Sequence, residues 1–307
     1  MEIVSVYNDK GGVGKTTMSL EIATAMALSG NRVLLIDNDP QGSLSLSCTT
    51  NIKNVRDGID KVYKGDVQLT DVICDTYIDN LFILPSGLKL KDYYIRRDVA
   101  TRERVTEIME FMKTDDDFVN LFDIVIFDNP PAQDGVALYC TMLADRIVLP
   151  VIPDDMCFDA LIRTYAYIKE QTPNFLDKYI VIVPSLVKNR VVHKRYLKVI
   201  ETEYQGKNDN TIVSEIRVGD RAEIPESIGL KHILFISHAA SESAQQYKNL
   251  CLDIFPWLEK EPFMQSLRNV AEEKKQTLRN NFKKMVEERR RLLNINTTVK
   301  IAEVTNG

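Results

Sequence analysis

A glycine-rich turn between a short apolar strand and a long helix constrains this chain more than any other feature of its sequence. Residues 10–17 read Lys-Gly-Gly-Val-Gly-Lys-Thr-Thr. Residues 2–8 before the turn carry several β-branched side chains, and residues 18–29 after it are rich in Ala and Leu. This arrangement predicts a strand, a glycine loop and a helix in that order, the first unit of a parallel α/β sheet.

The same turn is suited to binding phosphate groups. Backbone N–H groups at the start of a helix can converge on an anion, and glycine lets the backbone approach it closely. In such a loop Lys15 reaches the β- and γ-phosphates of a nucleotide, the Thr16 hydroxyl binds Mg²⁺, and Thr17 donates to the α-phosphate. The predicted nucleotide-binding residues are Gly11, Gly12, Val13, Gly14, Lys15, Thr16 and Thr17.

Carboxylates follow two further predicted strands. The apolar residues 32–36 lead into Asp37 and Asp39, and residues 122–127 lead into Asp128. Ligands of open parallel sheets bind outside the carboxyl ends of the strands, so we expect the three carboxylates to gather around one nucleotide and its Mg²⁺. For either aspartate of the first pair alone, capping of the next helix stays an open alternative.

These segments resemble the ParA/MinD family of deviant Walker ATPases, and most of all its ParA-type DNA partition ATPases. The motifs are the loop at 10–17 with its additional lysine, Asp-Asn-Asp-Pro-Gln-Gly at 37–42 and Asp-Asn-Pro-Pro at 128–131. One departure is Asp9, which stands where the common phosphate loop has its first glycine. The resemblance covers about residues 1–256.

The resemblance implies a fold and a domain division. We expect an α/β fold of the P-loop NTPase type and deviant Walker class. Its doubly wound, mostly parallel sheet has helices on both faces. The ATPase domain then covers residues 1–258, and residues 259–307 form a C-terminal helical extension and tail.

The resemblance also implies an ATPase that hydrolyses ATP to ADP and phosphate within a homodimer. ATP is sandwiched between two chains, and Lys10 contacts the phosphates held by the partner subunit. The implied catalytic residues are Lys10, Lys15 and Asp39, with Asp39 orienting or activating the attacking water. The implied Mg²⁺ ligands are Thr16, Asp37 and Asp128, and the implied cofactors are ATP and Mg²⁺.

A partition ATPase of this type binds double-stranded DNA without sequence preference when it holds ATP. It is released after hydrolysis, which a ParB-type centromere-binding partner stimulates, and it thereby segregates plasmid or chromosomal DNA. The net charge of −5 does not favour DNA binding, so DNA binding would have to depend on local groups of basic residues. The candidate DNA contacts are Lys188, Arg190, Lys194 and Arg195 after a predicted strand at 179–183, and Arg217 and Arg221 after one at 212–216.

These basic groups have an alternative interpretation as a solvated surface. A predicted helix at 263–293 is also basic, since residues 268–291 hold nine Lys or Arg against four Glu. It could pack on its own domain or the partner, extend a DNA-binding surface, or lie on an anionic membrane. The competing functions are therefore a MinD-like membrane-cycling positioning ATPase and an ATP-dependent dimerising scaffold with little turnover.

The remaining patterns narrow the class of protein. The five cysteines form no C-x-x-C pair, which favours reduced thiols, and none follows Asp128 closely, as an iron–sulfur reductase of this superfamily needs. No signal peptide or 18-residue apolar stretch is present, so we expect a cytoplasmic protein, nucleoid-associated when it holds ATP. Residues 51–79 predict short helices and loops, and residues 97–112 predict a helix.

Overall fold

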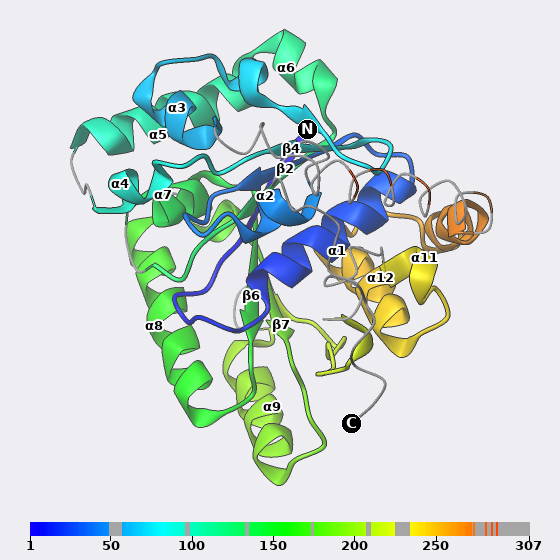
Figure 1. Cartoon of the computed structure of the whole chain (residues 1–307). Coiled ribbons are helices and arrows are strands. Elements are labelled where there is room, and N and C mark those ends of the chain that lie inside the picture. The colour runs from blue at the N-terminus through cyan, green and yellow to red at the C-terminus, as the bar shows by residue number, and fades with distance from the viewer. Residues whose placement is uncertain are drawn as a thin grey trace, which may run out of the picture.

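One eight-stranded sheet organises the chain (Figure 1). The structure, a computed structural model, describes residues 1–48, 57–95, 99–132, 135–172, 175–206, 210–224 and 234–271, and the single residues 273, 280, 284 and 287. The strand order is β3-β4-β2-β5-β1-β6-β7-β8, and every neighbouring pair is parallel except β3 with β4. The predicted α/β fold class is confirmed.

The strands are short and apolar, as strands covered on both faces must be. All five residues of β2 and all five of β5 are buried. The bounds are β1 Glu2–Val6, β2 Val33–Asp37, β3 Cys74–Asp75, β4 Leu81–Leu84, β5 Ile124–Asp128, β6 Arg146–Val151, β7 Tyr179–Pro184 and β8 Thr211–Val213.

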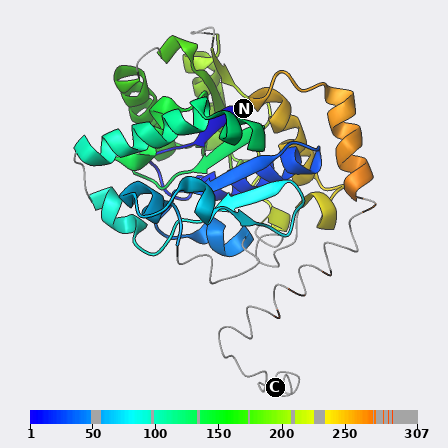
Figure 2. The ribbon, with the colours of Figure 1, turned by 90° about the horizontal axis from the view of Figure 1, so that it is seen from above.

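Helices cover both faces of the sheet (Figures 1 and 2). Apolar side chains fill the space between the helices and each face. On one face α1 and α12 pack over Val4 and Val6, whereas α5 and α7 cover Ile3 on the other. The helices are α1 Lys15–Leu28, α2 Ser43–Cys48, α3 Ile59–Lys64, α4 Leu90–Ile95, α5 Val99–Thr114, α6 Asp116–Leu121, α7 Val136–Leu143, α8 Asp155–Gln171, α9 Val191–Tyr204, α11 Leu234–Ser237 and α12 Glu242–Ile254, with 3₁₀ turns η2 Leu69–Val72 and η3 Phe175–Asp177.

Strand register fixes the geometry of the carboxyl edge. β5 lies between β1 and β2, so that Asp128 is paired with both Val6 and Asp37. The glycine loop leaves β1 at this same edge and enters α1 at Lys15. The two aspartates and the loop are therefore neighbours because of strand order.

Two local predictions were wrong. The segment 51–79 was expected to hold only helices and loops, yet Cys74–Asp75 forms β3, because these residues pair antiparallel with β4 at the sheet edge. The strand expected at 212–216 is β8, which ends at Val213. It ends there because the Ser214 hydroxyl accepts from the N–H of Ile216, which turns the chain out of the sheet.

The C-terminal helix joins the core of the domain. Residues 260–271 are helical (Figure 2). Phe263, Met264 and Leu267 are buried in the same apolar cluster as α1 and α12. Most of the helix predicted to reach residue 293 lies outside the described residues, so the division at 258 stays a prediction. No helix in the described part of the chain is long and apolar enough to cross a bilayer.

A carboxyl group is buried between α1 and α12. Glu21 of α1 is 3 % exposed and lies near Tyr247 and Cys251 of α12, whose pKa values the ionised form of Glu21 raises. Burial raises the pKa of Glu21 from its ordinary value of 4.5 to about 8. The native state therefore keeps a proton that the unfolded chain loses above about pH 4.5.

The wild-type protein should become less stable as the pH rises, and we expect Glu21→Gln to abolish this dependence on pH. Between pH 5 and pH 8 the unfolded chain binds fewer protons at this residue than the native state. The wild-type free energy of unfolding should then fall by about 1.4 kcal/mol per pH unit relative to the variant. Urea denaturation at three pH values measures this slope, with the exposed Glu103→Gln on α5 as control. Equal slopes in wild type and Glu21→Gln would contradict the assignment.

Candidate functional site

A cavity of about 970 Å³ opens at the carboxyl edge of the sheet. Its floor is the glycine loop, and its walls come from the segments that follow β2, β4, β5, β7 and β8. The lining residues are Gly11, Gly12, Gly14, Lys15, Thr16, Thr17, Asp39, Pro40, Gln41, Lys91, Pro130, Pro131, Ala132, Leu186, Asp220, Arg221 and Ile224.

The glycine loop is held in shape from below. Gly12 and Gly14 have φ angles of 76° and 89°, a conformation that side chains with a Cβ rarely adopt. The Asn8 side chain accepts from the N–H of Lys10 at 2.8 Å, and the Ser185 hydroxyl donates to the carbonyl of Val13, also at 2.8 Å. Val13 itself is buried in the core and does not line the cavity.

Lys15 is the basic group at the centre of the loop. Its Nζ donates to the carbonyl oxygen of Lys10 at 2.9 Å, so the side chain lies across the loop. Burial lowers the pKa of Lys15 to about 8, and the carboxylates of Asp128 and Asp39 oppose this shift. An anion bound in the cavity would add a further negative charge and favour the charged ammonium.

Asp128 is buried below the loop. Ser19 Oγ of α1 donates to Asp128 Oδ1 at 3.0 Å, and the hydroxyl of Thr16 lies beside the same carboxylate. Oδ2 has no hydrogen-bond partner among the described residues. Burial, and then the charge of Asp37, raise the pKa of Asp128 to about 8. This carboxylate is therefore short of positive partners.

Asp37 lies beside Asp128 but faces α2. It accepts from the backbone N–H of Ser45 at 2.7 Å and from the Ser45 hydroxyl, and burial raises its pKa to about 6. The capping contact considered as an alternative for this aspartate is therefore present, because Ser45 lies in the first turn of α2. Asp39 lines the cavity, and its Oδ1 accepts from the N–H of Gln41 at 2.8 Å.

The site suits a divalent cation that also binds phosphate oxygens. An unpartnered, buried Asp128 oxygen next to a threonine hydroxyl is a donor set of the hard oxygen type that Mg²⁺ prefers. Across the described ranges no group of three or more His, Cys, Asp or Glu could hold a metal by itself. Thr16, Asp128 and Asp37 would thus hold Mg²⁺ together with water and a nucleotide, rather than as a closed protein cage.

A buried amide network supports the site, and the sequence analysis did not find it. Asn129 Nδ2 donates to Ser5 Oγ, and Asn38 Nδ2 donates to Asn129 Oδ1, both at 2.9 Å. Tyr63 donates its hydroxyl proton to Asn38 Oδ1 at 3.1 Å. The network ties the ends of β1, β2 and β5 together. An asparagine next to each strand-end aspartate is the sequence signal that could have revealed it.

Lys10 differs from Lys15 in its surroundings. It is absent from the described lining residues, and its charge acts on Cys157 at the start of α8, where burial raises the thiol pKa to about 11. Lys15 therefore lines the cavity, whereas Lys10, five residues earlier, lies near Cys157.

The basic residues divide into two sets. Three already have a carboxylate partner: Lys188 with Asp220 at 2.6 Å, Arg217 with Glu201 at 2.8 Å, and Arg221 with Glu242. Arg221 also lines the cavity, as Lys15 and Thr16 do. The other three are exposed at the start of α9 and make no ion pair within the described ranges: Arg190, Lys194 and Arg195.

Ser45 links the site to its surroundings, so we expect Ser45→Ala to destabilise the protein. The buried hydroxyl donates to Asp37 and accepts from the N–H of Ser86 at 3.0 Å. Its loss leaves both groups without this partner and should lower the free energy of unfolding by about 1–3 kcal/mol. Urea denaturation measures the change. The control is Ser47→Ala on the same helix, whose hydroxyl donates to the Ser43 carbonyl and to no other group in the described part of the chain. Equal losses in both variants would contradict the assignment.

Comparison with known proteins agrees with this geometry. Residues 1–179 match the family model described as AAA domain. The sporulation initiation inhibitor protein Soj of Bacillus subtilis is 29% identical over 152 residues, which are 49% of this chain and 58% of Soj. The match thus spans less than two thirds of the length of Soj.

Solved structures share the fold. A plasmid partition protein from Borrelia burgdorferi B31 bound to AMPPNP superposes with a TM-score of 0.66 at 19% identity, covering 83% of this chain and 98% of that chain. A cobyrinic acid a,c-diamide synthase from Mycobacterium smegmatis with an ATP analog and magnesium gives 0.57 at 22% identity, covering 79% and 98%. The chain belongs to the AAA domain family and is similar to Soj and to a chromosome partitioning protein ParA.

Proposed function

We propose that this chain is a partition ATPase that binds ATP and Mg²⁺ in the cavity at the carboxyl edge. The observation that carries the proposal is the convergence of Lys15, Thr16, Asp39 and Asp128 around that cavity. Such a set of cation, hydroxyl and carboxylates fits phosphoryl transfer better than any other reaction class. The relation to partition proteins supports the same choice.

In the proposed reaction the chain positions groups and supplies charge. The N–H groups of the glycine loop and Lys15 hold the phosphates, and Lys15 moves from the Lys10 carbonyl to the ligand. Asp39 orients a water and accepts its proton as the water oxygen attacks the γ-phosphorus and the bond to the β–γ bridging oxygen breaks. Mg²⁺, when bound, neutralises charge on the phosphate oxygens.

The proposed active unit is a homodimer. Lys10 is not among the described residues that line its own cavity, which supports a role for its ammonium at the site of a second copy. A cation that arrives from a partner stabilises the charge that develops in the transition state, as an arginine finger does. Hydrolysis then depends on dimerisation, and loss of the γ-phosphate loosens the dimer.

The proposed DNA contact is the start of α9. Arg190, Lys194 and Arg195 are exposed there without ion-pair partners in the described chain, so they can neutralise phosphates at little cost. In the ATP-bound dimer the basic groups of the two subunits contact DNA together, so DNA binding depends on ATP. A ParB-type partner stimulates hydrolysis and release, and the ATP-bound form is associated with the nucleoid.

We expect binding to random duplex DNA only with ATP, and not with ADP or without nucleotide. The affinity should fall steeply with salt concentration, and Lys194→Ala/Arg195→Ala should reduce the slope of log affinity against log salt by about 4, because each of the two subunits loses two cations. Fluorescence anisotropy measures this. The control removes two cations at the opposite sheet edge, Arg32→Ala/Lys113→Ala, and should keep the slope. No DNA binding in any nucleotide state would instead favour the membrane-cycling or scaffold functions.

Lys10→Ala should bind nucleotide with nearly wild-type affinity but lose turnover by about 100-fold or more, because the transition state loses its cation from the partner. Titration with a fluorescent nucleotide and steady-state phosphate release separate these two effects. Lys15→Ala serves as the comparison, since it should lose nucleotide binding itself. Turnover of Lys10→Ala equal to that of the wild type would exclude the role in trans.

A further inference from the structure

Lys91 lines the cavity but belongs to none of the motifs that predicted the site. It is the second residue of α4, the helix that follows β4, and its side chain is exposed. Its neighbour Leu90 is buried in the core, so the next side chain along the helix points away from the core. The Lys91 ammonium can therefore contact a ligand bound in the cavity.

The strand order assigns Lys91 to one end of the cavity. β4 is next to β2, and the segment after β2 carries Asp39. The segments after β7 and β8 line the opposite end, on the other side of the glycine loop, with the apolar side chains of Leu186 and Ile224. The apolar end suits a base, and the end with Asp39 and Lys91 suits the terminal phosphate.

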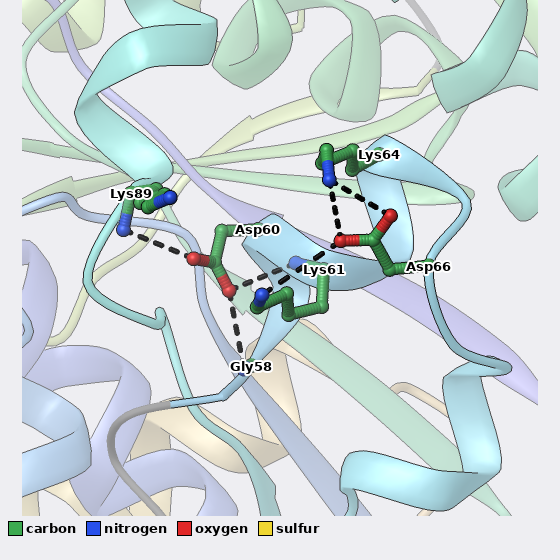
Figure 3. Close-up of polar contacts among 6 residues, drawn as sticks. All are labelled: Gly58, Asp60, Lys61, Lys64, Asp66 and Lys89. Carbon is green, nitrogen blue, oxygen red and sulfur yellow. Dashed lines mark hydrogen bonds and ion pairs between the residues drawn. The ribbon is translucent and has the colours of Figure 1, made fainter.

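Within the described residues, Lys91 is the cavity-lining cation whose side chain makes no hydrogen bond or ion pair. Lys15 donates to the Lys10 carbonyl, and Arg221 forms an ion pair with Glu242. No carboxylate in the described part of the chain forms an ion pair with Lys91, whereas Lys61 and Lys64 on nearby α3 share Asp66 (Figure 3). An anionic ligand could therefore bind Lys91 without breaking an ion pair to those residues.

The segment before Lys91 is fixed by a buried carboxylate. Asp60, which is 2 % exposed, accepts from the N–H groups of Gly58 at 3.2 Å, Lys61 at 2.8 Å and Lys89 at 2.9 Å (Figure 3). A Cβ at Gly87, whose φ is 77°, would lie 1.9 Å from Asp60 Oδ1, so the segment packs closely on this carboxylate. The backbone of Lys91 is thus held at the rim.

The same segment is tied to the proposed metal site. The N–H of Ser86 donates to Ser45 Oγ, which in turn donates to Asp37. One continuous chain of hydrogen bonds therefore joins Asp37 to the segment that carries Lys91. This connection attaches the backbone of that segment to one of the carboxylates below the loop.

We propose that Lys91 contacts the terminal phosphate of the nucleotide bound in its own subunit and thereby favours ATP over ADP. The proposal rests on the proposed function, because it takes the cavity to be a nucleotide site. ADP has no γ-phosphate, so its affinity does not depend on this contact. Lys91 is a specificity-determining residue for the triphosphate, in addition to the residues of the glycine loop.

The test compares the affinities of the full chain for ATPγS and ADP, both with Mg²⁺, at concentrations where sedimentation shows monomers. Lys91→Ala should weaken ATPγS binding about tenfold or more and leave ADP binding within about twofold. Lys91→Arg should retain most of the ATPγS affinity. The matched control is Lys89→Ala, since Lys89 contacts Asp60 through its backbone N–H and its side chain does not line the cavity.

Three results would overturn the role of Lys91 while the proposed function stands: an unchanged affinity for ATPγS, an equal loss for ATPγS and ADP, or a loss equal to that of Lys89→Ala. Wild-type protein that binds neither nucleotide would overturn the proposed function itself. Circular dichroism and the urea midpoint of each variant show that the fold is retained, and the exposed position of Lys91 makes a loss of fold an unexpected result.

Discussion

Two buried carboxylates at adjacent strand ends, Asp37 and Asp128, are the constraint on which the rest of the site depends. The parallel pairing of β2 with β5 puts them in register; burial disfavours the charged form of both, and the charge of Asp37 further disfavours ionisation of Asp128. Like charges in a buried place are costly unless cations or hydrogen-bond donors compensate them. The hydroxyls of Ser45, Ser19 and Thr16 supply part of that compensation, and a bound cation would supply the remainder.

The walls of the cavity follow from this arrangement. Each wall is a segment after a strand, and polar contacts fix each wall to a neighbour. On the side of β8 the N–H of Gly219 donates to Gln246 at 3.1 Å and Ser243 donates to Glu223 at 2.9 Å, so this wall is attached to α12. On the side of β4 the corresponding attachment is Asp60. The cavity is thus held between a helix on one face of the sheet and a carboxylate on the other.

Charge has different consequences in the core and at the rim. Burial between α1 and α12 favours the neutral form of Glu21, so the free energy of unfolding depends on pH. Arg190, Lys194 and Arg195 are exposed, so water screens them and they contribute little to folding. Their role in the proposed function comes from summing over two subunits, because single phosphate contacts are weak.

The sequence by itself determined the strand–loop–helix unit, the strand-end aspartates and the fold class. Glycine conformation, apolar periodicity and strand-end carboxylates are local properties, so they can be recognised without knowing the neighbours. Only the tertiary structure decided that Lys10 is not among the described residues that line its cavity, that Arg221 is one of them, that Asp60 holds the segment of Lys91, and that β8 ends at Val213. These facts depend on which strands lie side by side and on contacts between residues far apart in the chain. Strand order is set by the packing of the whole sheet, and no short stretch of sequence encodes it.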